Sequence, residues 1–303
     1  MAKKKKKKKS GFGKTFVMVF LIMIIAFTAI IFAIDKFGLG IPNPIAGGDG
    51  PLSDLYRDSD RVNVLLLGDT MQGLTDTIMV GSYDLKEQHV DLISVPRDTY
   101  YPRDDYPGAA LSKINSVYKT EEIGGAMSAI SDVLADIPIH AYAIIDEDDI
   151  RKIVDSMGGV PMDVPFDMKY TDKNTNLYID LKKGEQVLDG DKAVQFIRYR
   201  KGYKTGDYGR VEAQQQFMSN AFDQAVGWHL PKVAMTVVDN VETSLTAGNA
   251  FRFGAKGIFL KRDDMETHIL PGDSGYENNA SYFFVDEDAT EDMITEIYSY
   301  EKE

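Results

Sequence analysis

Residues 62–95 read VNVLLLGDTMQGLTDTIMVGSYDLKEQHVDLISV, and this stretch decides the fold class. It contains three short apolar runs, at residues 62–67, 77–83 and 90–95. The first run ends at Gly68, as a buried strand commonly does, and the polar residues KEQH join the second run to the third. We therefore expect three neighbouring buried strands.

Strands and helices alternate along the rest of the chain. Further strands are expected at residues 141–145 and 265–270. Helical spacing is present at residues 121–134, 146–157, 189–199, 208–226, 233–240, 248–260 and 287–300. This alternation predicts an α/β fold, an α/β/α sandwich whose central mixed sheet is covered by helices on both faces.

The N-terminal residues have the pattern of a membrane anchor. Residues 3–9 are all lysine, and Lys14 precedes the uncharged run TFVMVFLIMIIAFTAIIFAI at residues 15–34. A helix of this length crosses a bilayer core of about 30 Å, and positive charge beside a span stays in the cytoplasm. We expect a cytoplasmic tail at residues 1–14 and a single transmembrane helix at residues 15–34, with the remainder outside the cell.

A cleaved signal peptide is the alternative interpretation of this segment. Its apolar core would normally span about 7–15 residues and end at a small-residue cleavage site. The run here is longer, and it continues into Asp35 without such a site. An uncleaved anchor in the cell membrane is therefore the better prediction.

The Gly- and Pro-rich residues that follow predict an extracellular linker at residues 35–59, and the folded domain is expected at residues 60–303. The whole chain has a net charge of −13, and removing the eight lysines of residues 1–14 leaves −21 on residues 15–303. The electrostatic field of so negatively charged a domain will not attract nucleic acid. The absence of cysteine excludes disulfides and thiolate metal sites.

Two aspartates follow the first predicted strand. Asp69 comes directly after Gly68, and Asp76 lies seven residues further along. Carboxylates beyond buried strands commonly line the crevice of an α/β sheet, and a pair of them could hold Mg²⁺ or Mn²⁺ together with substrate phosphates. The alternative is that both aspartates cap turns or helices.

Two groups of basic residues could bind an anion at the same crevice. Arg97 follows a strand and a proline, and Lys113 precedes a helix in a polar loop. Arg198 and Arg200 would splay into one pocket if the helix ends there. Asp207, Arg210 and Gln214 share one helix face through their i, i+3, i+7 spacing. Guanidiniums and an amide around one cavity suit a pyrophosphate, although a structural Arg–Asp network is also possible.

These stretches together resemble the LytR-CpsA-Psr family of Gram-positive bacteria. The resemblance covers residues 60 to 300 and rests on VNVLLLG, TDTIMV, VDLISVPRDTY, SKINSVY, DLKKGEQVLDGDKAVQFIRYR, GDYGRVEAQQQF, HILPGD and FFVDEDATEDMITEIY. The family implies an α/β/α fold that holds a polyprenyl pyrophosphate lipid. It also implies transfer of a glycopolymer, such as teichoic acid or capsule, from that membrane lipid to peptidoglycan with Mg²⁺ assistance.

The resemblance also implies roles for the candidate residues. Asp69 and Asp76 fall on the metal-linked carboxylates of the family. The pyrophosphate-binding positions correspond to Arg97, Lys113, Arg198, Arg200, Arg210 and Gln214. Asp207 falls on a further functional position, where it would act as the base or hold an arginine, and with Arg97 and Arg198 it forms the expected catalytic set.

The chain departs from the family pattern at three positions. Where the family often has arginine, this sequence has Met71, Leu74 and Ala213. Fewer cations imply a weaker grip on pyrophosphate, another polymer preference, or loss of transfer. Two other functions therefore stay open: a polyprenyl pyrophosphate hydrolase that uses water as acceptor, and a non-catalytic membrane-bound regulator.

Overall fold

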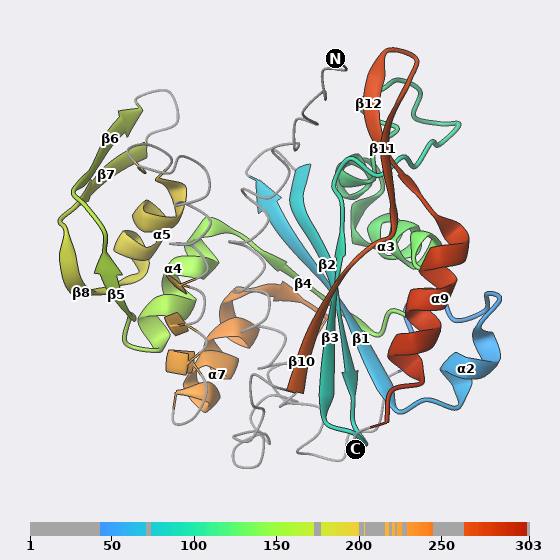
Figure 1. Cartoon of the computed structure of the whole chain (residues 1–303), viewed down its shortest axis with the longest axis horizontal. Helices are drawn as coiled ribbons and strands as arrows, with labels where there is room; N and C mark the ends of the chain where they lie inside the picture. Colours follow the sequence, from blue (N-terminus) through green and yellow to red (C-terminus); the bar gives the residue numbers. More distant parts are fainter. Residues whose placement is uncertain are drawn as a thin grey trace, which may run out of the picture.

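A computed structural model describes residues 43–70, 74–172, 177–199, 203, 216–217, 220–221, 223–225, 229–244 and 264–301. Its centre is a six-stranded sheet with the strand order β10-β3-β2-β1-β4-β9 (Figure 1). The strands are β1 (Arg61–Thr70), β2 (Leu74–Asp84), β3 (His89–Val95), β4 (Ala141–Ile145), β9 (Glu242–Thr243) and β10 (Met265–Ile269). The pairs β1–β4 and β3–β10 are parallel, whereas β1–β2, β2–β3 and β4–β9 are antiparallel, so the sheet is mixed as expected.

The apolar run of β1 serves two cores at once. Val62, Val64 and Leu66 belong to one buried cluster, whereas Leu65 and Leu67 belong to another. Successive side chains of a strand point to opposite faces, so a strand covered on both sides is apolar at nearly every position. The VNVLLL pattern thus indicates a sheet with helices on both faces.

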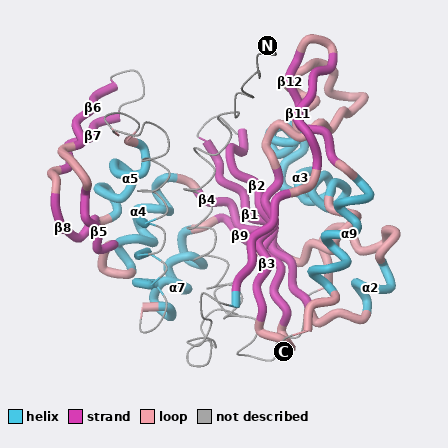
Figure 2. The backbone as a smooth tube through the Cα atoms, in the orientation of Figure 1, coloured by secondary structure: helices cyan, strands magenta, loops and turns pink. Residues whose placement is uncertain are grey.

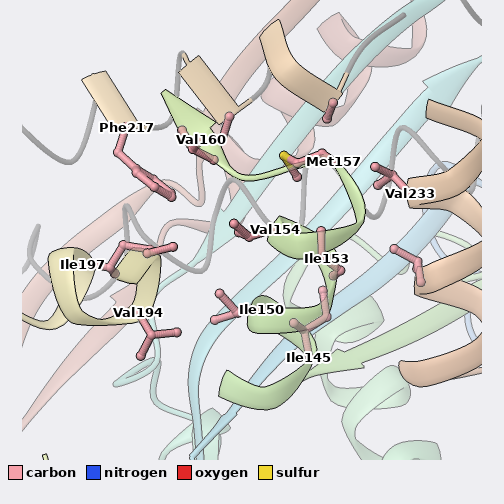
Figure 3. Close-up of a cluster of buried hydrophobic side chains, with 14 of the residues drawn as sticks. Ile145, Ile150, Ile153, Val154, Met157, Val160, Val194, Ile197, Phe217 and Val233 are labelled. Atoms are coloured by element: carbon pink, nitrogen blue, oxygen red, sulfur yellow. The ribbon is translucent and has the colours of Figure 1, made fainter. Parts of the chain in front are cut away.

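On one side of the sheet lie α4 (Glu147–Ser156), α5 (Gly190–Arg198) and α7 (Leu230–Asn240), as Figure 2 shows. Two small antiparallel sheets flank them, β5 (Val160–Val164) with β8 (Gly184–Leu188), and β6 (Met168–Asp172) with β7 (Leu177–Leu181). Figure 3 shows how Ile150, Ile153 and Val154 of α4 meet Val194 and Ile197 of α5 within this core.

On the opposite side lie α2 (Ser53–Arg57), the short 3₁₀ turn η1 (Ile114–Ser116), α3 (Val117–Val133) and α9 (Glu287–Tyr298). A hairpin of β11 (Gly272–Glu277) and β12 (Ala280–Val285) precedes α9. The helical segment α3 is interrupted at Glu122, whose φ is 57°, and the sequence predicted a helix from residue 121 onward.

The start and end of α4 follow the predicted signals. The Asp146 side chain accepts hydrogen bonds from the backbone N–H groups of Asp148 and Asp149, and the Asp149 carboxylate accepts from the Asp146 N–H in return. Gly158 and Gly159 have φ of 83° and 86° and end the helix, as expected from the sequence. The antiparallel pairs β5–β8, β6–β7 and β11–β12 were not predicted, because their strands carry weak apolar patterns.

Part of the segment expected to be a linker packs on the domain. The Ile45 N–H donates to Ile139 O at 2.6 Å, and the Tyr56 hydroxyl donates to Ala135 O at 2.6 Å. Within the part of the chain that the structure describes, no helix has the length and apolar character needed to cross a bilayer. Residues 15–34 lie outside that part, as do residues 248–260 and most of 208–226, so those elements stay predictions.

Candidate functional site

One edge of the central sheet gathers the functional candidates. Gly68 of β1 pairs with Ile145 of β4 on one side and with Thr77 of β2 on the other. One residue further along β2, Ile78 pairs with Val95 of β3. The ends of β4, β1 and β3 and the beginning of β2 therefore lie along a single edge. With strands about 4.8 Å apart, this edge spans roughly 14 Å from β4 to β3.

A β-bulge lies in the middle of this edge. Gly68 pairs with Thr77, but the next residue, Asp69, pairs with Thr75, so Asp76 is the extra residue of β2. Bulges often occur beside functional sites, where they redirect side chains. The backbone thus brings the two predicted metal-linked aspartates to neighbouring positions on adjacent strands. Aspartate carboxylates are of the oxygen-ligand type that Mg²⁺ prefers, and the side chains of both residues lie outside the described part of the structure.

Beyond β3, a single carboxylate contacts two of the predicted anion-binding residues. Lys113 Nζ lies 2.8 Å from Asp98 Oδ1, and Arg97 Nε lies 4.0 Å from Asp98 Oδ2. Arg97 has 46% of its side chain exposed, and Lys113 has 24%. Asp98 directly follows Arg97 in the sequence and is a local partner for it. It also bonds Lys113, so the structure brings these two residues together.

Arg103, with 10% of its side chain exposed, fixes the loop that carries Lys113. Arg103 donates from Nη2 to Leu111 O at 2.7 Å and to Ser116 Oγ at 2.8 Å, and from Nη1 to Thr120 Oγ1 at 2.6 Å. These bonds connect the middle of the loop to its end at Leu111, to η1 and to the start of α3. The loop is therefore held on η1 and α3 by side-chain contacts that no short sequence motif indicated.

On the other side of the bulge, Arg198 is held by a glutamate. Arg198 Nη1 lies 2.9 Å from Glu147 Oε1 and 3.0 Å from Glu147 Oε2. Glu147 is the first residue of α4, directly after β4, so this pair stands at the same sheet edge as the bulge. Arg198 ends α5, and Tyr199 has an extended backbone, as the sequence predicted. Glu147 was missed, because only the fold brings α4 and α5 together.

The close crossing of α4 and α5 depends on a glycine. A Cβ atom at Gly190 would lie 2.4 Å from Arg151 O and 2.6 Å from Arg151 Cα. No side chain fits there without moving one helix. Gly190 is thus a positioning residue for the Arg198–Glu147 pair, since those two residues belong to the two crossing helices.

The remaining members of the predicted cluster are Arg200, Asp207, Arg210 and Gln214, and they lie outside the described residues. Their contributions stay predictions.

A cavity of about 600 Å³ lies elsewhere, between α3 and α9, and its charged lining consists of Asp132, Asp136, Glu287 and Glu291. An acidic lining repels anions, so this cavity does not suit a pyrophosphate.

Sequence comparison then identifies the family. The model of the LytR_cpsA_psr family matches residues 46–298. The chain belongs to the LytR-CpsA-Psr family. The match covers the central sheet and the helices on both of its faces, and it begins before α2, in agreement with the packing of that helix on the domain.

Two curated relatives illustrate the range of names within the LytR-CpsA-Psr family. The polyisoprenyl-teichoic acid–peptidoglycan teichoic acid transferase TagV of Bacillus subtilis (strain 168) is 29% identical over 226 residues, which is 72% of this chain and 57% of TagV. The regulatory protein MsrR of Staphylococcus aureus (strain COL) is 31% identical over 234 residues, 73% of this chain and 68% of MsrR. The chain thus spans little more than half the length of TagV.

A solved structure agrees with the fold. The crystal structure of Bacillus subtilis TagV superposes with a TM-score of 0.57 at 26% identity, over 80% of this chain and 98% of that one. The expected mixed sheet flanked by helices is therefore the architecture of the LytR-CpsA-Psr family.

Proposed function

We propose that this protein transfers an anionic glycopolymer from a polyprenyl pyrophosphate carrier to peptidoglycan, by phosphoryl transfer assisted by Mg²⁺ or Mn²⁺. The polymer would be a teichoic acid or a capsular polysaccharide. One observation carries the proposal: the bulge with Asp69 and Asp76 lies between Arg97 and Lys113 on one side and Arg198 on the other. The names of TagV and of TagU from Oceanobacillus iheyensis, both teichoic acid transferases, support it.

The described cations have a direct role in this mechanism. Arg97, Lys113 and Arg198 would bind the pyrophosphate oxygens, and Asp98 and Glu147 would hold the last two in place before the substrate arrives. Phosphoryl transfer needs positioning and charge neutralisation more than covalent chemistry, and such preorganised donors supply both. A cation held by Asp69 and Asp76 would neutralise further charge on the phosphates.

The bond changes follow from this arrangement. An acceptor hydroxyl of peptidoglycan forms a new bond to the phosphorus next to the sugar, and the bridging P–O bond of the pyrophosphate breaks. Polyprenyl phosphate leaves, and the hydroxyl proton is released. Asp207 would accept that proton or hold an arginine in place. An anchor at residues 15–34 would keep the domain beside the membrane-bound carrier, at the outer face of the cell membrane.

A product assay tests the proposal. The full-length protein in liposomes is given a polyprenyl-pyrophosphate-linked glycopolymer, with and without peptidoglycan. Polymer attached to peptidoglycan, and release of polyprenyl phosphate only when peptidoglycan is present, is the expected result. Release in its absence would instead identify a hydrolase. Asp76→Ala should abolish transfer, whereas Asp58→Ala, at an exposed carboxylate after α2, should leave it unchanged.

A regulatory role is the second candidate, and the similarity to the regulatory protein MsrR favours it. A purified protein that binds the carrier lipid but neither transfers nor releases polymer would point to this function. In that case Arg198→Ala should reduce lipid binding without changing wall polymer content in cells. If the protein is a transferase, Arg198→Ala should lower both the lipid binding and the wall polymer content.

A further inference from the structure

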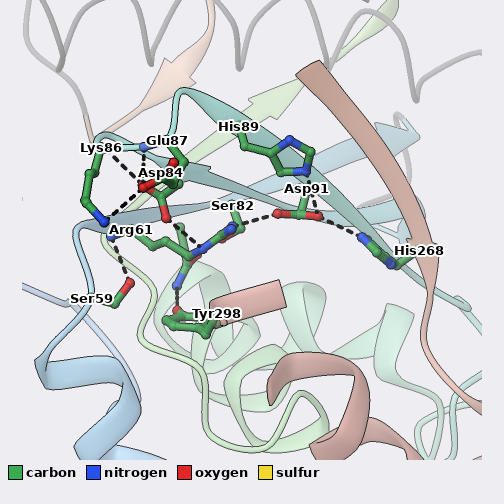
Figure 4. A network of polar contacts seen from close by, with 11 residues as sticks. Ser59, Arg61, Ser82, Asp84, Lys86, Glu87, His89, Asp91, His268 and Tyr298 are labelled. Atoms are coloured by element: carbon green, nitrogen blue, oxygen red, sulfur yellow. Dashed lines mark hydrogen bonds and ion pairs between the residues drawn. The ribbon is translucent and has the colours of Figure 1, made fainter. Parts of the chain in front are cut away.

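A second polar cluster lies at the opposite end of the same strands (Figure 4). His89 and Asp91 stand at the beginning of β3, and Glu266 and His268 stand on β10, which runs parallel beside it. Arg97 is six positions after Asp91 and lies just beyond the end of β3, so at about 3.3 Å per residue the two are up to roughly 20 Å apart. The cluster is therefore separate from the anion site, and its chemistry does not depend on the proposed function.

Three side chains of this cluster converge. The register pairs Glu266 with Asp91, so both project from the same face of the sheet, and His89 lies two residues before Asp91 on that face. One ligand atom from each of His89, Asp91 and Glu266 lies within 4.8 Å of the other two. Ligands about 2.1 Å from a common zinc-like ion are roughly 3–4 Å apart, so a small contraction would gather these atoms around one ion.

The imidazole of His89 provides an independent indication. The residue is 2% exposed, and its Nε2 has no hydrogen-bond partner among the described residues. That nitrogen is directed at Asp91, with Oδ1 at 3.5 Å, and the ring is stacked on Tyr300 with the centroids 3.9 Å apart. Buried polar atoms are nearly always paired, and a neutral imidazole nitrogen is a preferred metal ligand.

Two neighbouring side chains orient the Asp91 carboxylate through hydrogen bonds, as is common for the ligands of a bound metal ion. Arg61 Nη1 donates to Oδ2 at 2.6 Å, and His268 Nε2 lies 2.8 Å from Oδ1. An ionised carboxylate oxygen has two lone pairs, so Oδ1 can accept from His268 and still bind a cation. Hydrogen bonds of this kind fix the ligand and raise its affinity for metal.

Charge and access are also favourable. The cluster and the side chains paired with it contain three carboxylates, Asp84, Asp91 and Glu266, against the guanidinium of Arg61 and the imidazole of His268, so a divalent cation would offset the remaining negative charge. Asp91 and His89 are buried, whereas Glu266 is exposed. An ion could therefore enter from solvent on the side of β10.

We propose that His89, Asp91 and Glu266 form a binding site for a divalent transition metal ion of the zinc class, which fastens β10 to β3. One imidazole and two carboxylates suit Zn²⁺, Mn²⁺ or Co²⁺. Mg²⁺ prefers oxygen ligands alone, so this site would not compete for the Mg²⁺ of the transfer reaction.

The test uses full-length protein in detergent, stripped of metal with a chelator. Zn²⁺ binding is measured by calorimetry, Co²⁺ binding by its visible absorption, and thermal stability by the melting temperature. Glu266→Gln and His89→Gln remove one ligand each. His229→Gln is the matched control, since His229 is exposed and its Nδ1 lies 3.0 Å from Gln224 O, away from the cluster.

Wild type and His229→Gln should bind Zn²⁺ with equal affinity, and a hundredfold excess over Kd should raise Tm by about 5 °C or more. Glu266→Gln and His89→Gln should bind at least about tenfold more weakly and lose most of this shift. Glu266→Gln should keep transfer activity in Mg²⁺, because it lies at the other end of the sheet.

Glu266→Gln is the deciding variant, since an exposed residue can be replaced without unfolding the core, whereas His89 is part of the buried interior. Equal Zn²⁺ affinity in wild type and Glu266→Gln would overturn the proposal. So would the absence of saturable binding by wild type, or an equal loss of binding in His229→Gln. Failure of the transfer assay would leave each of these results unaffected.

Discussion

Two arginines near opposite ends of the central sheet are held in contrasting ways. Arg61 opens β1 with a fully buried side chain, and its Nη1 lies 2.6 Å from Asp91 Oδ2. Arg97 follows β3 with 46% of its side chain exposed and with Asp98 only at 4.0 Å. A guanidinium removed from water needs fixed partners, whereas one beside solvent can take a phosphate as a new partner. We therefore expect the Arg61 end to contribute to stability, and we propose that the Arg97 end binds the ligand.

Arg61→Ala gives the largest expected effect. It would leave Asp91 buried without its guanidinium partner, and breaking a buried pair in this way costs about 3–5 kcal/mol of unfolding free energy. Urea denaturation of the full chain measures the loss. The control is Arg57→Ala, whose side chain is 72% exposed and pairs with Asp54, and which should change stability by less than about 0.5 kcal/mol. A loss below about 1 kcal/mol for Arg61→Ala would contradict the assignment of stability to this end.

Arg198→Ala should act on the reaction and not on the fold. Removing one preorganised donor lowers the rate by about 10²–10³-fold. Arg198→Lys should rescue little, because lysine cannot make two parallel bonds to an anion. Arg151→Ala is the matched control, since Arg151 also lies near Glu147, at 3.7 Å, but makes its shorter contacts with Asp148 and Asp191. Normal transfer by both Arg198 variants would make that arginine structural.

The buried end should also respond to pH through His140. The His140 Nδ1 accepts a hydrogen bond from the Asn63 N–H at 3.0 Å, and burial lowers the pKa of His140 to about 4. The unfolded chain therefore binds this proton first as the pH falls below 6.5, and stability is lost between pH 6.5 and 4. At pH 4.5 the loss is about 2.5 kcal/mol.

His140→Gln tests that prediction, because an amide oxygen can still accept from Asn63 but does not titrate. Urea denaturation at pH 7.5 and pH 4.5 should give a smaller pH-dependent loss in the variant than in wild type. Equal losses in both proteins would mean that His140 is not the group responsible.

Arg97→Ala gives the smallest expected change in stability and so sharpens the comparison most directly. A side chain that is 46% exposed and forms a surface ion pair with Asp98 at 4.0 Å should contribute less than about 0.5 kcal/mol to unfolding. Transfer activity should nevertheless fall, since Arg97 would bind the pyrophosphate. A marked drop in melting temperature would place Arg97 with Arg61 and remove the distinction between the two ends.

Features set by residues close together in the sequence could be predicted, whereas contacts between residues far apart in the sequence could not. Five strands of the central sheet (β1, β2, β3, β4 and β10) and the helices α3, α4, α5, α7 and α9 were predicted, because local apolar periodicity indicates burial. Arg97, Lys113 and Arg198 could be named as candidates because they lie at strand and helix ends within short motifs. Glu147 and Asp98, which hold two of them, were not assigned these roles, since a carboxylate in a loop has many possible partners until the fold is known.

The cluster around Asp91 at the Arg61 end could not be predicted from the sequence for the same physical reason. His268 and Asp91 are 177 residues apart, and only the parallel pairing of β10 with β3 brings them together. The patterns HVD in β3 and METHI in β10 each look like an ordinary strand. A parallel pairing across so many residues leaves no local signal from which the cluster could be predicted.

The bond between Asn63 and Tyr298 has a consequence for the order in which the molecule is made. Asn63 Nδ2 donates to the Tyr298 hydroxyl at 2.6 Å across 235 residues of chain. At about 5–20 residues per second, a ribosome needs roughly 10–50 s to synthesise that interval. During this time β1 exists without α9, the helix that packs on the polar residue Asn63 near the beginning of β1. The nascent β1–β2 hairpin therefore needs protection from other chains for most of the time that the protein takes to be synthesised.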